Sequence, residues 1–142
     1  MNALQILRSV LAVIIGLLLI SALVEGVEFA LVGAIHGQPV TNPEEYYAIR
    51  NLPWFLGLKL IYNSLAAIAG GYISALIAGY AKIKHGVALA GIQTLAFIWA
   101  IVQPDLGQRL AVWFWMLLIF LSVGGILLGA VFQARGNQKG KI

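Results

Sequence analysis

Four long apolar stretches occupy most of this 142-residue chain, and they constrain its fold more than any other feature. A helix needs about 20 mostly apolar residues to cross about 30 Å of hydrocarbon at about 1.5 Å per residue. Residues 7–35, 54–80, 83–102 and 110–132 each meet this requirement. The sequence therefore predicts an all-α membrane protein with four transmembrane helices in two hairpins, with residues 1–135 forming a single domain.

The composition excludes several function classes. Hydrophobic residues make up 61% of the chain and charged residues only 10%, and the four spans leave no room for a separate soluble domain. The chain has no cysteine, which rules out disulfides, thiol chemistry and cysteine-ligated metals. No nucleophile with its partners and no metal-ligand motif is present, so we expect a non-enzymatic protein without metal or cofactor.

The distribution of Lys and Arg predicts the topology. One side of the predicted membrane carries Arg8, Lys82, Lys84, Arg135, Lys139 and Lys141, and the other carries Arg50, Lys59 and Arg109. By the positive-inside rule the first side is cytoplasmic, which places both termini in the cytoplasm. Residues 136–142 are expected to form a disordered basic tail near anionic lipid. The basic residues form no patch with exposed aromatics, so nucleic acid is not an expected partner.

The connection between the first and second spans contains a helix signal of its own. Asn42 is a good N-cap, Pro43 suits the first helical position, and Glu44 and Glu45 complement the helix dipole. We therefore expect a short helix on the outer membrane surface before Pro53. The connection at residues 103–107 is predicted to be a tight turn.

Two carboxylates in the first span are the main candidates for chemistry. Glu25 and Glu28 are three residues apart and therefore share a helical face. Measured from Gly33 at the outer boundary, Glu28 lies about 7 Å deep and Glu25 about 12 Å. Lys59 and Asn63 of the second span lie at matching depths, which predicts a polar cluster of these four side chains.

Two interpretations of this cluster remain open. It is either a proton- or cation-coupled site or polar ligand site, with the deeper Glu25 as proton carrier, or a salt bridge that fixes the register of the first hairpin. Gln93 and Thr94 of the third span are possible further members, although a helix-to-helix hydrogen bond is the more usual role of such residues. His36 and His85 flank the spans and are expected to be solvated loop residues.

Small residues predict where helices approach one another. Gly70 and Gly71 in the second span and Gly124 and Gly125 in the fourth lie at similar distances from cytoplasmic charges. Each pair is followed by a small residue four positions later, and such stripes allow close backbone packing in lipid. We expect the second and fourth spans to contact each other there.

The order of these features resembles a group of small, four-span bacterial membrane proteins of uncharacterised function. The resemblance rests on the segment Arg8-Ser9-Val10-Leu11-Ala12-Val13, on Glu25, on Gly70-Gly71-Tyr72 and on Ala78. It covers most of the chain and implies a bacterial inner membrane. The segment Gln38-Pro39 contains less proline than is typical of that group, so the outer loop is expected to differ.

Two functions from different classes remain. The first is an accessory or interaction subunit, with the lipid bilayer and either a protein partner or a second copy as its surroundings. The second is a small oligomeric transporter or channel that uses Glu25 and Glu28. No proline interrupts a predicted span, and broken helices are typical of transporter sites, so the sequence favours the first.

Overall fold

The computed structural model describes residues 2–103 and 110–139, with side chains to residue 136. Within these residues the chain forms five helices and no strand. They are α1 (Ala3–His36), α2 (Pro43–Arg50), α3 (Pro53–Ala78), α4 (Lys82–Val102) and α6 (Val112–Lys139). All but α2 are long and apolar enough to cross a membrane. This confirms the all-α fold with four long apolar helices.

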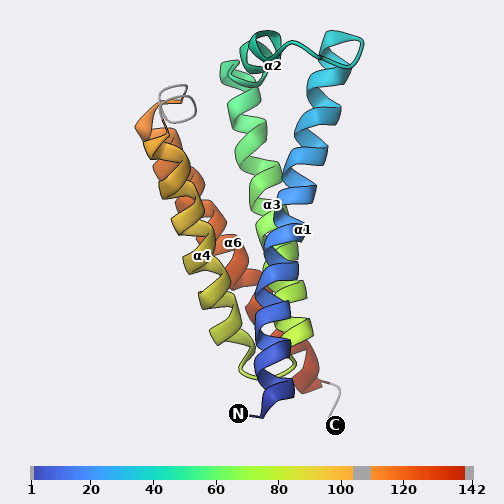
Figure 1. Ribbon diagram of the computed structural model, residues 1–142, viewed down its shortest axis with the longest axis vertical. Helices are drawn as coiled ribbons and strands as arrows, with labels where there is room; N and C mark the ends of the chain where they lie inside the picture. The colour runs from blue at the N-terminus through green and yellow to red at the C-terminus, as the bar shows by residue number, and fades with distance from the viewer. Residues whose placement is uncertain (1, 104–109, 140–142) are drawn as a thin grey trace.

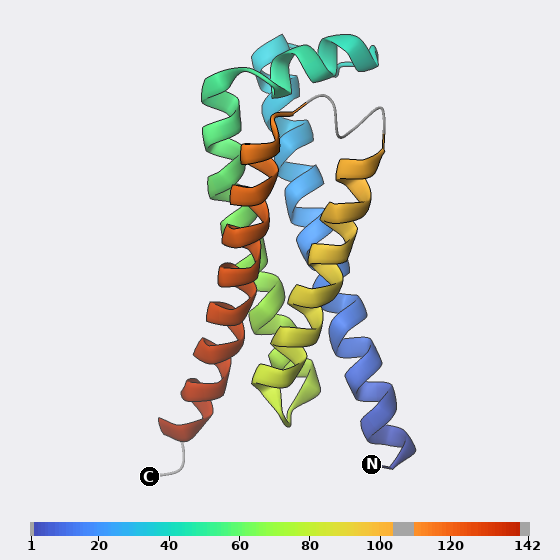
Figure 2. The same cartoon turned by 90° about the vertical axis from the view of Figure 1, so that its left-hand side faces the viewer.

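The long helices run alternately up and down the molecule (Figure 1). α1 begins and α6 ends at the same end, which we call the terminal end; the opposite end carries α2 and is called the α2 end. α3 is the central element, because it contacts all four of the other described helices. α2 lies across the α2 end, almost perpendicular to the long helices (Figure 2).

Local signals account for the ends of the helices. Asn2 and Gln5 form a capping box at the start of α1, and Gly37, with φ 84°, terminates that helix in the left-handed conformation. The side chain of Asn42 accepts a hydrogen bond from the amide of Glu44, and Pro43 opens α2. The short helix expected after the first span is therefore present, and its place relative to a membrane stays a prediction.

Glycine residues, which have no side chain, allow α3 and α6 to come into backbone contact. A Cβ atom at Gly71 would collide with the backbone of Ile126, and one at Gly129 would collide with the backbone of Ile68. A Cβ at Gly125 would crowd Ala67 and the Ser64 carbonyl of α3 at 2.9 Å each. Such close approach is how helices associate where lipid supplies no hydrophobic drive.

The two remaining predicted packing glycines lie elsewhere. Gly70 faces α1, where a Cβ would meet the side chain of Ile20 and the carbonyl of Gly16. Gly124 lies one helical position away from the α3 contact, and a Cβ there would meet nothing within 4 Å. Only one glycine of each pair therefore lies in the α3–α6 contact, because adjacent helical residues point about 100° apart.

The C-terminal region is more helical than the sequence indicated. α6 continues to Lys139, so its last residues belong to the segment expected to be a disordered tail. Gly136 does not end the helix, and a Cβ there would meet no described atom within 4 Å. Residues 140–142, like the turn expected at 103–107 beyond Gln103, lie outside the described residues.

Candidate functional site

A buried carboxylate, Glu28, is the centre of the candidate site, which lies between α1, α2 and α3. Glu28 is only 1% exposed. Lys59 Nζ of α3 lies 2.8 Å from Glu28 Oε2, and Arg50 Nε of α2 lies 2.9 Å from Glu28 Oε1. The carboxylate therefore bridges two cations that come from two other helices.

Two phenols complete the coordination of the same carboxylate. Tyr62 donates a hydrogen bond to Glu28 Oε2 at 2.6 Å, and Tyr46 donates one to Glu28 Oε1 at 3.2 Å. Each carboxylate oxygen thus has one cation and one hydroxyl as partners. An ionised carboxylate only accepts hydrogen bonds, and all four partners carry donors, so the geometry fits the charged form of Glu28.

The cluster expected from the sequence did not include Tyr46 and Arg50, which α2 contributes. Tyr46 and Arg50 are four residues apart and so share a face of α2, which turns that face toward α1 and α3. The guanidinium of Arg50 also lies 5.8 Å from the centre of the Tyr46 ring and 5.3 Å from that of Tyr47. α2 therefore closes the α2 end of the α1–α3 pair with a cation and a phenol.

An apolar wall separates the cluster from its surroundings. Val32 and Phe55 are completely buried beside Tyr62, with Leu58 and Ile49 packed against them. Interactions between charges are stronger in such an environment than in water. Burial, reinforced by the negative charge of Glu28, raises the pKa of Tyr46 to about 12, so its hydroxyl remains a donor at neutral pH.

The four residues expected to cluster are only partly brought together. Lys59 contacts Glu28, as described above. Asn63 is buried, but its side-chain amide donates to the Lys59 backbone carbonyl at 2.8 Å, a contact within its own helix and not with Glu28. Glu25 is exposed and makes no hydrogen bond or ion pair within residues 2–103 and 110–139.

Glu25 stands apart for a geometric reason. Residues three apart on a helix differ by about 60° in direction, so only one of the two carboxylates can point directly at α3. The packing of α1 on α3 directs Glu28 inward. Thr94, offered as a further member, donates instead to the Ala90 carbonyl of its own helix at 2.8 Å.

The structure contains a second polar cluster, at the terminal end, that was not predicted from the sequence. His85 was expected to be a solvated loop residue, but it lies in the first turn of α4 and is only 8% exposed. Its Nε2 atom lies 3.0 Å from Ser9 Oγ of α1, and the hydroxyl of Tyr80 also contacts Ser9. Because the connection from α3 to α4 is so short, Tyr80 and His85 meet across it, 5.3 Å between ring centres. His36, in contrast, is only partly buried and lies 3.5 Å from Glu45.

These features define the class of the protein: a helical protein of the membrane type, with four described helices able to span a bilayer and an enclosed ion cluster. Over 81 residues, 54% of this chain, it is 41% identical to the multi-drug resistance efflux pump PmrA homolog of Lactococcus lactis subsp. lactis strain IL1403. The alignment covers 19% of that protein, so the chain spans about a fifth of its length. No family model matches the chain, and no solved structure matches it significantly.

Proposed function

We propose that this protein is a non-enzymatic interaction subunit that assembles with other membrane helices through the exposed face of α1 around Glu25. The observation that carries this proposal is an exposed carboxylate without a hydrogen bond or ion pair among the described residues, in the middle of an apolar helix. Phe29, one turn further along the same face, is 56% exposed. The face thus combines a carboxylate with a large apolar surface.

The energetics of insertion support a partner at Glu25. A carboxylate at the bilayer centre costs about 2.5 to 3.5 kcal/mol, and Glu25 lies about 12 Å along the helix from Gly33. A cation or hydrogen-bond donor on a neighbouring helix offsets that cost. Within the described residues, Lys59 and Arg50 form their ion pairs with Glu28 and not with Glu25.

The closed state of the Glu28 cluster also supports a structural role. A carboxylate with four donor partners has no free lone pair directed at a ligand, and no described proline interrupts a long helix beyond its first turn. This arrangement supports the interpretation of the cluster as a salt bridge that fixes the register of the first hairpin. In this proposal Glu28 holds α1, α2 and α3 together, and Glu25 on the neighbouring face makes the outside contact.

The same proposal places the protein in the cytoplasmic membrane of a bacterium with both termini inside. Arg8, Lys82, Lys84 and Arg135 all belong to the terminal end, and the described carboxylates belong to the α2 half. This asymmetry follows the positive-inside rule. The similarity to a bacterial pump homolog agrees with such a membrane.

Site-specific photo-cross-linking in native membranes tests the proposal. A photoreactive residue at Phe29 should cross-link to one defined membrane protein, and the same residue at Phe120, 74% exposed on α6, serves as the matched control. The cross-linked complex should survive extraction in mild detergent. Glu25→Leu should abolish it, and Glu44→Gln, at an exposed carboxylate of α2, should not. A Phe29 probe that reacts only with lipid would reject the proposal.

A second candidate is a small transporter that works as an oligomer. The similarity to an efflux pump favours it, and Glu25 would then be the coupling carboxylate. In this case the Phe29 probe should cross-link to a second copy of the chain. Purified protein in liposomes should also carry out a proton-dependent flux that Glu25→Gln abolishes while the oligomer persists.

A further inference from the structure

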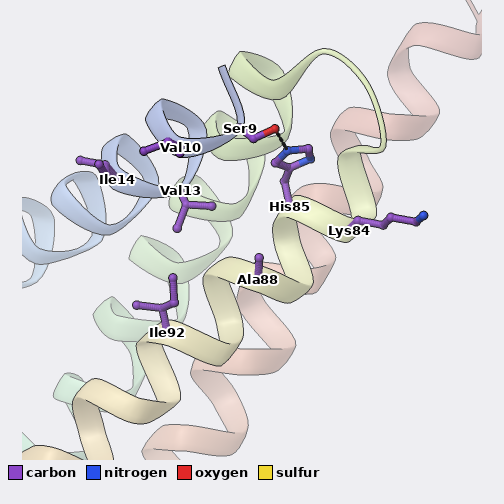
Figure 3. A pocket seen from close by; sticks show the side chains of 8 residues that line it. All are labelled: Ser9, Val10, Val13, Ile14, Lys84, His85, Ala88 and Ile92. Atoms are coloured by element: carbon purple, nitrogen blue, oxygen red, sulfur yellow. Dashed lines mark hydrogen bonds between the residues drawn. The ribbon is translucent and has the colours of Figure 1, made fainter. Parts of the chain in front are cut away.

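An amphipathic groove runs between α1 and α4 at the terminal end of the molecule. Its volume is about 400 Å³, and it is lined mainly by apolar side chains. The lining consists of Ser9, Val10, Val13 and Ile14 from α1 and Lys84, His85, Ala88 and Ile92 from α4. Val13, Ala88 and Ile92 lie between the two helices, and the Ser9–His85 hydrogen bond closes one end (Figure 3).

The groove is open to the side that would face lipid. Val10, Ile14 and Ile92 are 49%, 46% and 44% exposed. Along α4 the groove runs from Lys84 to Ile92, which corresponds to about 12 Å at helical rise. A flexible hydrocarbon chain can enter such a groove laterally from the bilayer and replace lipid contacts with side-chain contacts.

A second hollow of about 400 Å³, which contains two lysines, adjoins the groove at Lys84. It is formed by the connection between α3 and α4 and by the first turn of α4, and it includes Lys82. Ala81 occupies the N-cap of α4 and provides no side-chain hydrogen bond, so the first amides of this helix have no side-chain cap. Uncapped helix N-termini and lysine ammonium groups both attract phosphate.

The charges around this hollow have one sign. Arg8 and Arg135 belong to the same end as Lys82 and Lys84, and all carboxylate side chains of the described residues belong to the α2 half. Arg8 is already engaged, because its guanidinium donates to the carbonyl of Ile77 at 3.1 Å. Lys82 and Lys84 both lie in the first turn of α4 and both line the hollow.

From this juxtaposition we propose that the terminal end of the protein binds one anionic phospholipid. Its phosphate lies in the hollow between Lys82, Lys84 and the N-terminus of α4, and one acyl chain lies in the α1–α4 groove. Basic pockets between membrane helices on the cytoplasmic side are typical headgroup sites. This site is at the opposite end from the Glu28 cluster and does not depend on a partner at Glu25, although its cytoplasmic location rests on the orientation proposed above.

Native mass spectrometry of the detergent-purified chain tests this proposal with two lipids of identical chains. Phosphatidylglycerol should bind about tenfold more tightly than phosphatidylcholine, because only the former carries a net negative charge. Lys82→Gln combined with Lys84→Gln should remove this preference. Arg135→Gln removes a charge at the same end but outside the groove and the hollow, so this variant should retain the preference.

The acyl-chain part of the proposal needs its own variants. Ala88→Phe fills the groove and should weaken binding of both lipids about tenfold, and Ala96→Phe, at an exposed alanine of α4 outside the groove, should not. If Ala88→Phe does not fold, Val10→Phe on the α1 side replaces it. Equal affinity for the two lipids, or equal binding by the groove-filling variant and its control, would overturn the proposal. So would complete competition by glycerol phosphate, which indicates a headgroup site without a chain.

Discussion

Lys59 Nζ lies 2.8 Å from Glu28 Oε2, and the two residues, from different helices, are only 5% and 1% exposed. An ion pair this deeply buried loses its hydration, so its stability depends on complete pairing. Arg50, Tyr46 and Tyr62 supply the remaining partners of Glu28. The α1–α3 pair is therefore held by a cluster whose members depend on one another.

Neutralising Glu28 should strongly destabilise the protein. Glu28→Gln leaves Lys59 and Arg50 buried without a counter-charge, and breaking a buried pair in this way costs about 3 to 5 kcal/mol. The free energy of unfolding in mixed detergent micelles measures this loss. Glu25→Gln is the matched control, because the same chemical change at an exposed position should alter stability by less than about 0.5 kcal/mol.

A double substitution separates the charge from the packing. Glu28→Leu with Lys59→Met removes one cation together with the carboxylate, so it should recover part of the stability that Glu28→Leu alone loses. If the double variant is as unstable as the sum of the two single variants, Glu28 and Lys59 do not act as a pair.

The α3–α6 contact should distinguish between neighbouring glycines. Gly71→Ala places a methyl group against the backbone of Ile126, and overpacking of this kind costs about 1 to 3 kcal/mol. Gly124→Ala meets open space and should be neutral or slightly stabilising, because alanine loses less entropy than glycine in a helix. Thermal unfolding of both variants in detergent tests this. Equal effects would contradict the backbone contact.

Alkaline pH should weaken the attachment of α2. The pKa of Tyr46 is raised to about 12 in the folded protein, against about 10 in an unfolded chain. The folded state therefore holds a proton that the unfolded state loses, and the stabilisation is complete below about pH 10 and declines toward pH 12. Tyr46→Phe should flatten the fall in melting temperature over this range. Tyr72→Phe, which changes an exposed phenol on α3, should retain the wild-type profile.

The orientation can be tested directly, since the chain contains no cysteine. A membrane-impermeant maleimide applied to intact cells should label a cysteine introduced at Glu44, in α2. It should label one at Gly136, near the end of α6, only after the membrane is permeabilised. The reverse pattern would contradict the proposed cytoplasmic termini.

The sequence alone determined the elements of this protein. The four apolar stretches predict the four long helices, because an uninterrupted apolar segment of that length has few alternatives to a helix. Asn42 and Pro43 predict α2, because capping and proline geometry act locally. Lys59 was also identified as a partner of Glu28, since equal depth in antiparallel helices is readable from residue counts.

Only the tertiary structure decided which face of each helix points inward. α1 has apolar residues on every side, so its sequence contains no periodic signal that separates Glu25 from Glu28. The packing of α1 on α3 buries Glu28 and leaves Glu25 exposed. Arg50 and Tyr46 join the cluster because α2 folds across the end of the bundle, and His85 is buried because α4 turns back toward Ser9. Each of these contacts joins residues from different helices, and their direction is set by how the helices pack.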